Sequence, residues 1–356
     1  MSAAILVVVH DLSLGGTERI AIRLANAWAE RGRRVTLFCG TTAGPLRTLV
    51  APSVRIVAAD PAVPRAPGTR RALGRATRAF LRQDPHDIIF VPGNYHWPVV
   101  PFVAHSARVV AQVSAALHKP QRARLAQLAF AVRMRRRLRD AAAVATLSDL
   151  HARHARTLLP GRRIETIPLP ALPDHPPKPV QPPAGRPLVL GVGRLVPEKG
   201  FDLLIRAFSA LPDRAARLAI VGDGPERARL AALAARMGVT DRVELVGYVA
   251  DVRAWMERAR VFVLPSRHEG YPAVVIEALA AGRAVIATDC TPAVELVVAS
   301  GGRVVPIDDP AALTDALAAV LAAPAPDPLV VAAGVARFRI GAVAERYLTL
   351  FDELTS

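Results

Sequence analysis

The sequence predicts an α/β protein with two parallel-sheet domains, and three observations lead to this fold class. The chain has 356 residues, which is too long for one ordinary domain. Apolar runs alternate with longer stretches of helical periodicity, as is typical of a parallel sheet covered on both faces. The proline-rich stretch 173–187 interrupts this alternation once and divides the chain into two similar halves.

In the first half, continuous apolar runs predict buried strands, and the longer stretches between them predict helices. Ile20–Arg31 has an apolar face at helical spacing and stops at Gly32, which suits a helix terminus. A second helix, rich in arginine, is predicted over Gln121–Arg139, with an apolar side formed by Leu125, Leu128, Ala129 and Val132. The predicted strands are Ala4–Val9, Val35–Cys39, Ile88–Val91, Val109–Val113 and Ala143–Leu147.

The same alternation restarts after the prolines. The predicted strands are Leu188–Val192, Arg217–Val221, Val243–Val246, Val261–Leu264 and Ala284–Thr288. The predicted helices are Gly200–Leu211, Glu226–Met237, Val252–Arg258 and Ala273–Ala281. We therefore expect domains at 1–172 and 188–335, a linker at 173–187, and a C-terminal helix at 336–356 that packs back toward the first domain. Ligands of such sheets bind beyond the carboxyl ends of the strands, so a cleft between the domains is the expected site.

Composition narrows the possible functions. The formal net charge of +16 suits a nucleic acid, an anionic membrane or an anionic substrate as partner. Cys39 and Cys290 lack the spacing of a metal site or a disulfide framework. The N-terminal segment lacks the features of a signal peptide, and no apolar run reaches the ~20 residues of a spanning helix, so we expect a cytoplasmic protein. The loop after the first strand is not GxGxxG, which disfavours a nicotinamide dehydrogenase.

Two motifs in the second half have the chemistry of an anion site. Arg194 and Lys199 lie five residues apart in the loop after a predicted strand, and two cations before a helix suit a diphosphate. Glu269 and Glu277 lie eight residues apart around Pro272, which fits the first position of a helix. Taken alone, each motif also fits an ordinary solvated loop or helix.

A third motif follows the first strand of the chain and reads Gly15-Gly16-Thr17-Glu18-Arg19. Glycine in such a loop lets the backbone approach a ligand closely, although a plain strand-to-helix turn explains it equally well. Each of the three motifs is weak evidence alone, and it is their order along the chain that indicates a function.

In that order they resemble one family, the retaining glycosyltransferases of family 4, also called glycosyltransferase group 1, which have the GT-B fold. The first half matches GGxER followed by RGxxVTL, and the second matches GRLxxxKGxDLLIxAF, VGDGPER and SxxEGxPxVxxEALAxGxxVIATD. The resemblance implies two Rossmann-like domains that face a central cleft. It also implies a hexosyltransferase that moves a sugar from a nucleotide-sugar donor, expected to be a UDP-sugar, to a glycan or lipid-linked acceptor.

The resemblance implies roles only where the motifs match. Arg194 and Lys199 match the pair that neutralises the donor diphosphate. Glu277 matches the glutamate that bonds the ribose hydroxyls, and Glu269 matches the glutamate beside the transferred sugar. His118 is similar to a histidine near the anomeric carbon. The remaining donor-binding positions are Gly16, Gly193, Gly222, Gly224, Tyr248, Gly270, Tyr271 and Pro272.

Some features depart from the family pattern or bear on its chemistry. Many members read Ile-Pro-Asn-Pro-Val near the end of the first domain, where this chain has Ile167-Pro168-Leu169-Pro170-Ala171. Tyr271-Pro272 replaces the commoner Phe-Gly pair, which leaves the sugar open. No DxD pair stands where a metal would bridge the phosphates, so we expect a metal-independent reaction without a cofactor other than the donor. We also expect Glu269 to position the sugar rather than attack it.

Three other classes of function compete with this interpretation. A nucleotide-sugar 2-epimerase of the same fold would turn over the donor without an acceptor. A nucleic-acid binder would interleave basic and aromatic residues, but aromatics make up 5% of the chain, so we expect no nucleic acid. A catalytically dead scaffold is disfavoured because the motif residues are all present.

For the acceptor, the sequence gives one indication, which is the distribution of charge between the two domains. Residues 1–180 contain 27 basic and 10 acidic side chains, whereas the remainder contains 19 basic and 20 acidic ones, so the excess lies in the first domain. The helix at Gln121–Arg139 could lie on an anionic membrane or could present a solvated basic face. We therefore expect a cytoplasmic enzyme that associates peripherally with the inner face of the cell membrane.

Overall fold

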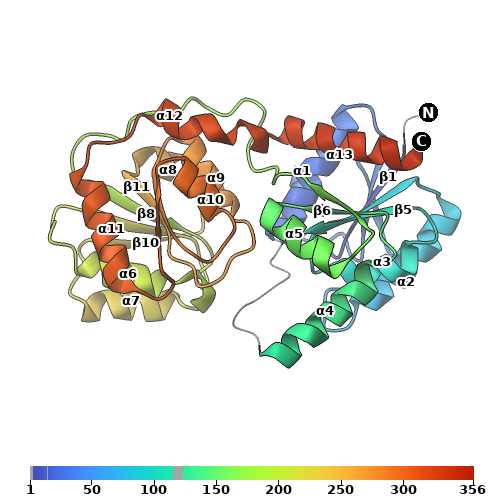
Figure 1. The fold of residues 1–356 in the computed structure, drawn as a ribbon, viewed down its shortest axis with the longest axis horizontal. Coiled ribbons are helices and arrows are strands. Elements are labelled where there is room, and N and C mark those ends of the chain that lie inside the picture. Colours follow the sequence, from blue (N-terminus) through green and yellow to red (C-terminus); the bar gives the residue numbers. More distant parts are fainter. Residues whose placement is uncertain (1–2, 14, 115–122) are drawn as a thin grey trace. The chain divides into compact units, whose positions relative to one another are not determined.

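The computed structural model describes residues 3–13, 15–114 and 123–356, which form two compact units (Figure 1). Unit 1 comprises the chain up to Asp174 together with Phe338–Ser356, and unit 2 comprises His175–Arg337. Each unit is a parallel sheet covered by helices. The prediction of two parallel-sheet domains is therefore confirmed.

Unit 1 has a seven-stranded parallel sheet with the strand order β3-β2-β1-β4-β5-β6-β7. Its strands are β1 (Ile5–Val9), β2 (Val35–Cys39), β3 (Arg55–Ala58), β4 (Ile88–Val91), β5 (Arg108–Val113), β6 (Ala143–Thr146) and β7 (Arg163–Thr166). Its α-helices are α1 (Gly16–Glu30), α2 (Arg70–Gln83), α3 (Val100–Val103), α4 (Arg124–Leu138), α5 (Asp149–Leu158) and α13 (Ile340–Thr355). Two 3₁₀ helices complete it, η1 (Pro45–Leu49) and η2 (Trp97–Val99).

Strand β1 shows why the buried strands read as continuous apolar runs. Ile5, Val7 and Val9 pack into the core on one face of the sheet, and Leu6 and Val8 pack into a second core on the other face. Successive side chains of a strand point to opposite faces, so a strand covered on both sides needs an apolar residue at every position.

The C-terminal helix α13 is part of the unit 1 core. The Trp28 ring on α1 lies edge-on against Tyr347 and Phe351 of α13, with ring centroids 5.7 and 5.1 Å away. Its indole N–H donates to the carbonyl of Ala344 at 3.3 Å. Buried aromatic pairs of this kind contribute energy beyond their buried area. The last helix of the chain, which has 16 residues, is thus packed on the first helix (Figure 1).

Unit 2 has a six-stranded parallel sheet with the order β10-β9-β8-β11-β12-β13. Its strands are β8 (Leu188–Val192), β9 (Arg217–Val221), β10 (Val243–Gly247), β11 (Val261–Leu264), β12 (Ala284–Thr288) and β13 (Arg303–Val305). Its α-helices are α6 (Phe201–Ser209), α7 (Arg227–Arg236), α8 (Arg253–Arg258), α9 (Ala273–Ala280), α10 (Val294–Ala299), α11 (Pro310–Ala322) and α12 (Pro328–Ala332). The 3₁₀ helices are η3 (Pro197–Lys199) and η4 (Ala333–Phe338), whose last residue belongs to unit 1.

The proline-rich stretch 173–187 contains no helix or strand. Two arginines of unit 2 bind its backbone: Arg253 donates to the carbonyls of Pro177 and Lys178 at 3.2 and 3.1 Å, and Arg283 donates to that of Val180. Arg283 is buried, and burial lowers its pKa to about 10. Residues 175–187 thus lie against unit 2 and belong to it.

Several elements differ from the sequence predictions. Helix α1 begins at Gly16, four residues before the predicted start at Ile20. The prediction started late because the first turn has no apolar residue, so the apolar periodicity begins only at Ile20. The predicted C-terminal helix corresponds to α13, but no prediction covered β3, α2, α5, β7 or the elements α10, β13, α11 and α12. The edge strand β3 has only partly buried or exposed residues, and α2 carries five arginines, so neither shows a long apolar pattern.

Candidate active site

The predicted donor-binding residues of unit 2 gather at one edge of its sheet. Strands β8 and β11 are neighbours there, and the strand order runs outward from them in both directions. Such a reversal point, at the carboxyl ends of the strands, is where open α/β sheets bind ligands. Gly193, Arg194 and Lys199 follow β8, whereas Glu269 follows β11, so the two predicted motifs meet at this point.

Lys199 and Glu269 form an ion pair at this edge. The Lys199 ammonium donates to Glu269 Oε1, and the Ser266 hydroxyl donates to the same oxygen at 3.0 Å. The side chains of Lys199 and Glu269 are 25% and 12% exposed. A carboxylate that accepts two hydrogen bonds is held in one orientation, so the glutamate and the lysine are both fixed before any ligand arrives.

Backbone contacts set the positions of the loops. Gly200 has φ +64°, and a Cβ there would lie 2.0 Å from the carbonyl oxygen of Pro265, just after β11. Gly222 has φ +139°, and its Cβ would lie 1.9 Å from the carbonyl oxygen of Gly193. Only glycine permits these approaches, so the loops after β8, β9 and β11 contact one another through their backbones.

Arg267 joins the two motif loops and was not predicted from the sequence. It binds both carboxylate oxygens of Asp202 at 2.8 and 2.9 Å, and it donates to the carbonyl of Pro197 at 2.7 Å. It also binds Asp308 at 2.6 Å. Burial raises the pKa of Asp202, but the hydrogen bonds and charge of Arg267 outweigh it and lower that pKa. The bidentate geometry makes Arg267 the brace that holds the Lys199 loop beside Glu269.

The loop after β11 leads directly into α9. Pro272 was predicted at the first helical position. In the structure it is the N-cap residue, and the helix begins one residue later, at Ala273. The carbonyl of Gly270 accepts a hydrogen bond from Thr291 at 2.7 Å, which fixes the loop from the side of β12. Glu277 lies on the second turn and is half-buried, and Tyr271 is half-buried beside Pro272. The free N–H groups of this helix start, with Lys199 nearby, can bind an anion.

The other predicted positions line the same edge. Arg194 is exposed and has no ion-pair partner among the residues that the structure describes. Gly222 and Gly224 follow β9, and Tyr248 follows β10 with 58% of its surface exposed. The edge therefore combines an unpaired guanidinium, an exposed aromatic ring and glycines at which a ligand can come close to the backbone. Burial raises the pKa of the nearby Cys290 thiol to about 11, so this thiol is protonated and a poor nucleophile.

Two predicted residues lie elsewhere. Gly16 is the first residue of α1 in unit 1, and a Cβ there would meet no atom within 4 Å. Packing therefore does not explain why this position is glycine. His118 lies outside the described residues. The described strand β5 ends at Val113, the same end that the sequence predicted for it.

Unit 1 has a polar cluster that the sequence analysis missed. Arg65 donates to Asp11 at 2.7 and 3.2 Å and also to Glu18, and both acids are buried. Its guanidinium lies 4.6 Å from the ring centre of Tyr95, and that of Arg70 lies 4.8 Å from the same ring. Asp11 follows β1 and Tyr95 follows β4, so the cluster marks the reversal point of the unit 1 sheet. The polar residues directly after these strands were the available signal.

A neutral histidine lies beneath this cluster. The backbone N–H of His10 donates to Nε2 of the fully buried His96 at 3.1 Å, and His96 Nδ1 donates to the carbonyl of Pro92 at 2.9 Å. Burial lowers the pKa of His96 to about 4, so the ring stays neutral. Both ring nitrogens are used by the backbone, so His96 supports the loops rather than moving a proton.

Comparison with known proteins yields two family matches. A family described as "Glycosyl transferase 4-like domain" matches residues 15–170, and one described as "Glycosyl transferases group 1" matches residues 186–323. Together the two matches span most of both units. The second contains the whole edge formed by Arg194, Lys199, Glu269 and Glu277.

Curated relatives match over parts of their length. A lipopolysaccharide core biosynthesis mannosyltransferase, LpcC of Rhizobium leguminosarum bv. viciae, is 36% identical over 149 residues, 40% of this chain and 42% of that protein. The lipopolysaccharide core biosynthesis glycosyltransferase LpsE of Rhizobium meliloti is 41% identical over 106 residues, 30% of this chain and 31% of that protein. These matches span between about a third and two fifths of the relatives' length.

Solved structures of similar fold cover nearly the whole chain. Sucrose-phosphate synthase from Thermosynechococcus elongatus aligns with a TM-score of 0.79 and 21% identity over 99% of both chains. Anabaena Alr3699/HepE in complex with UDP aligns with a TM-score of 0.77 and 19% identity, over 98% of this chain and all of that one. The chain thus has the fold of these proteins, GT-B.

Proposed function

Because this chain belongs to the group 1 glycosyl transferases, we propose that it transfers a sugar from a nucleoside-diphosphate sugar to a glycan acceptor. The observation that carries the proposal is the ion pair of Lys199 and Glu269 beside the unpaired Arg194, at the reversal point of the unit 2 sheet. Two cations and a helix start suit a diphosphate, and a fixed carboxylate beside them suits sugar hydroxyls.

In the proposed reaction, the bond between the anomeric carbon and the diphosphate breaks first. Negative charge then develops on the leaving diphosphate, where Lys199, Arg194 and the backbone N–H groups before α9 stabilise it. Fixed donors of this kind need little rearrangement during the reaction, which is why their effect on rate is large. The acceptor hydroxyl attacks from the face that the diphosphate leaves, so the anomeric configuration is retained, and its proton leaves with the diphosphate.

The two glutamates have separate roles in this proposal. Glu269 is held by Lys199 and Ser266, so it orients the sugar through its hydroxyls and does not attack the anomeric carbon. Glu277, one helical turn into α9, binds the ribose hydroxyls. Arg194 and Lys199 carry the positive charge that a divalent metal supplies in other sugar transferases, so we propose a metal-independent reaction.

The finer identity of the substrates is also a proposal. Solved structures that share the fold include complexes with UDP and with UDP-glucose, which supports a UDP-sugar as donor. Relatives named for lipopolysaccharide core biosynthesis support a lipid-linked or polysaccharide acceptor. Gly16 has no side chain, so a phosphate could approach the backbone at the start of α1 closely. The space beside it is open, because a Cβ at this position would meet no atom within 4 Å.

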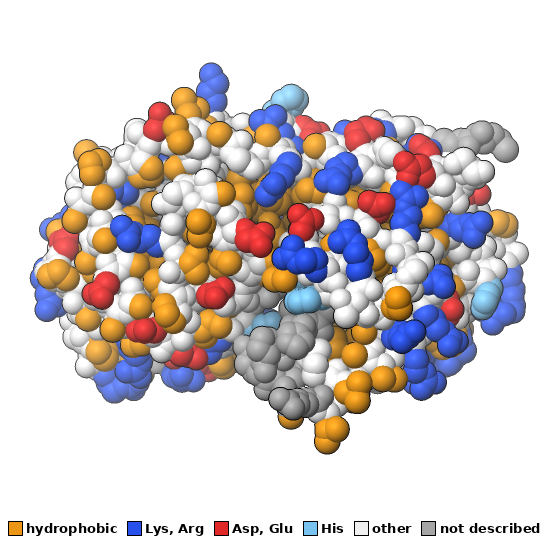
Figure 2. Space-filling view, in the orientation of Figure 1, with side chains coloured by type: hydrophobic (Ala, Val, Ile, Leu, Met, Phe, Trp, Pro, Cys, Tyr) orange, Lys and Arg blue, Asp and Glu red, His pale blue; other side chains and the backbone are white. Residues whose placement is uncertain are grey.

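The acceptor proposal extends to an anionic membrane surface, through helix α4. Its apolar side is exposed: Leu125, Leu128 and Val132 are 82%, 62% and 52% accessible. Figure 2 shows exposed hydrophobic side chains over this helix with Lys and Arg side chains beside them. Its last turns carry Arg133, Arg135, Arg136, Arg137 and Arg139. These exposed leucines and valine can bury in the headgroup boundary of a membrane, and the arginines that follow them can bind its anionic headgroups. None of the helices in the described part of the chain is long and apolar enough to cross a membrane.

Vesicle flotation tests this surface. We expect the protein to float with phosphatidylglycerol-containing vesicles and to stay behind with pure phosphatidylcholine. The double variant Leu125→Ser/Leu128→Ser should bind more than ~10-fold more weakly, since a fully buried leucine contributes about 1.5–3 kcal/mol. Leu329→Ser, at an exposed leucine of unit 2, is the matched control and should bind normally. Equal flotation of the double variant and the control would refute the proposal.

The transferase proposal is tested by release of a nucleoside diphosphate from a panel of nucleotide sugars. The purified chain should hydrolyse one donor slowly without an acceptor, with chelator present. The same assay gives the reference rate for the variants considered in the Discussion.

A further inference from the structure

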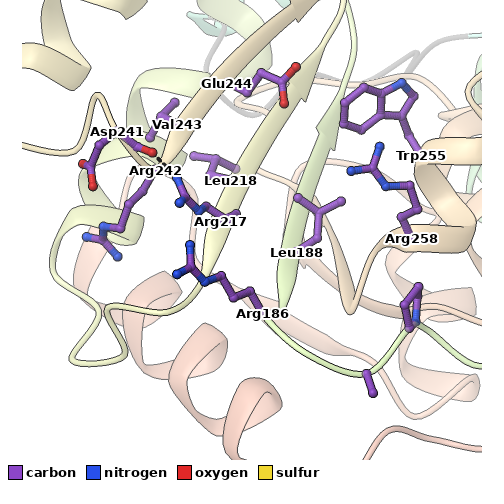
Figure 3. A pocket seen from close by; sticks show the side chains of 12 residues that line it. Arg186, Leu188, Arg217, Leu218, Asp241, Arg242, Val243, Glu244, Trp255 and Arg258 are labelled. Carbon is purple, nitrogen blue, oxygen red and sulfur yellow. Dashed lines mark hydrogen bonds between the residues drawn. The ribbon is translucent and has the colours of Figure 1, made fainter.

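Unit 2 has a hollow at the edge of its sheet opposite the proposed donor site (Figure 3). Its volume is about 540 Å³, which lies within the usual range of small-molecule sites. The floor is formed by residues at the amino ends of three strands: Leu188 of β8, Leu218 of β9 and Val243 of β10. Parallel strands have their amino ends at one edge, so a whole strand length separates this hollow from Lys199 and Glu269.

The hollow is positively charged. Four arginines and only two acidic residues line it: Arg186, Arg217, Arg242, Arg258, Asp241 and Glu244. None of these arginines forms an ion pair with any acid in the described ranges. Elsewhere in the chain, by contrast, arginines such as Arg65 and Arg267 each bind two acids. The hollow therefore keeps a net positive charge, with four arginines against two acids and no ion pair between these described residues.

The arginines come from different elements, and three of them lie on one side of the hollow (Figure 3). Arg217 of β9 donates to the backbone carbonyl of Asp241, which fixes its guanidinium, and Arg186 extends toward it from the chain before β8 (Figure 3). Arg242 is buried and stacked 4.9 Å from the Phe208 ring centre, and its Nη2 has no hydrogen-bond partner among the described residues. Positive side chains that line one hollow favour an anion as its occupant, because an anion can accept hydrogen bonds from their guanidinium groups.

The opposite wall of the hollow is aromatic. Trp255 of α8 is partly exposed, and Arg258 lies 4.8 Å from its ring centre. The other two tryptophans, Trp28 and Trp97, are fully buried in unit 1. An exposed indole above an apolar floor offers a flat surface to a ring-shaped ligand, while the arginines offer donors to a charged group.

We propose that this hollow binds an anionic saccharide, that is, a sugar with a phosphate or carboxylate group. The sugar ring lies against Trp255 and the floor of Leu188 and Leu218. The anionic group is bound by Arg186 and Arg217. Because the hollow is remote from the donor edge, it holds a saccharide that is not the one being transferred, such as a charged part of a growing glycan. The binding claim stands apart from the proposed transfer reaction.

Tryptophan fluorescence tests the proposal on the intact protein, because Trp255 is the single tryptophan of the three that a ligand can reach. Glucose 6-phosphate and glucuronate serve as anionic probes, with glucose and inorganic phosphate as the neutral and ring-free probes. We expect saturable emission changes with the two anionic sugars and at least ~10-fold weaker binding of glucose and of phosphate, since each lacks half of the contacts.

Two variants distinguish this hollow from other basic surfaces. Arg186→Gln/Arg217→Gln replaces the two arginines assigned to the anionic group and should weaken binding of the anionic sugars by about 10-fold or more. Arg236→Gln on α7 removes the same kind of charge outside the hollow and should bind normally. Arg194→Ala should also bind normally, which separates the hollow from the donor site. The proposal is overturned if no anionic sugar gives a saturable change, if phosphate binds as tightly as glucose 6-phosphate, or if the double variant binds like wild type.

Discussion

Replacing Lys199 by alanine should lower sugar transfer by about 10²–10³-fold, the usual effect of removing one group that stabilises charge in the transition state. The ammonium lies at the reversal point of the unit 2 sheet and is held by Glu269, so it meets a leaving diphosphate without rearrangement. Its loss has a second effect, because the nearly buried Glu269 carboxylate is left without its cation and repels the diphosphate.

Turnover of the donor by purified variants measures this effect. Lys178→Ala is the matched control, because Lys178 is an exposed lysine in the proline-rich stretch and should leave the rate unchanged. Arg194→Ala should lose activity to a similar extent, since its guanidinium has no other partner in the described chain. Rates within about threefold of wild type for both Lys199→Ala and Arg194→Ala would remove the cation pair from the mechanism, because such a loss is less than 1 kcal/mol.

Replacing Trp28 by alanine should destabilise unit 1 by about 3–5 kcal/mol, the usual cost of truncating a large buried aromatic residue. Trp28 is fully buried, packs against Phe90, Tyr347 and Phe351, and donates its indole N–H to α13. The variant leaves a cavity between α1 and α13 and removes the hydrogen bond that Trp28 donates to the Ala344 carbonyl. Detachment of the C-terminal helix is the expected first step of its unfolding.

Urea unfolding followed by far-ultraviolet circular dichroism measures this loss. Trp255→Ala is the control, because Trp255 is partly exposed and lies in unit 2, so it should leave the unit 1 transition in place. Protease cleavage before α13 should accelerate in Trp28→Ala and not in the control. An unchanged midpoint for Trp28→Ala would show that α13 does not depend on this aromatic contact.

The parallel-sheet fold was predictable because buried strands leave a strong pattern. Strands covered on both faces, such as β1, are apolar at every position, so most strands were found with bounds that agree within one residue. Edge strands such as β3 and arginine-rich helices such as α2 lack this pattern, because only part of their surface packs. Residues 175–187 are held against unit 2 by Arg253 and Arg283, whose side chains donate to backbone carbonyls of this stretch. The sequence could not predict these contacts, because no residue pattern indicates which carbonyls an arginine binds.

The candidate residues of the donor site could be predicted where they belong to motifs that follow one another in a fixed order along the chain. Lys199 and Glu269 are 70 residues apart and meet because β8 and β11 are neighbours, which only the structure shows. Arg267 was missed because this chain has arginines in most loops, and only the bidentate contact with Asp202 distinguishes it. The arginine hollow was missed for the same reason, since its four arginines come from four separate segments.

The most direct test of the proposed function is acceptor-free turnover of nucleotide sugars by the purified protein, in chelator, with products followed by nuclear magnetic resonance. We predict that a UDP-sugar is cleaved to UDP and a free sugar whose anomeric configuration is initially that of the donor. Lys199→Ala should abolish this release and Lys178→Ala should not. Conversion of the donor to an epimer with the diphosphate still attached, or no turnover of any nucleotide sugar by a folded protein, would contradict the proposal.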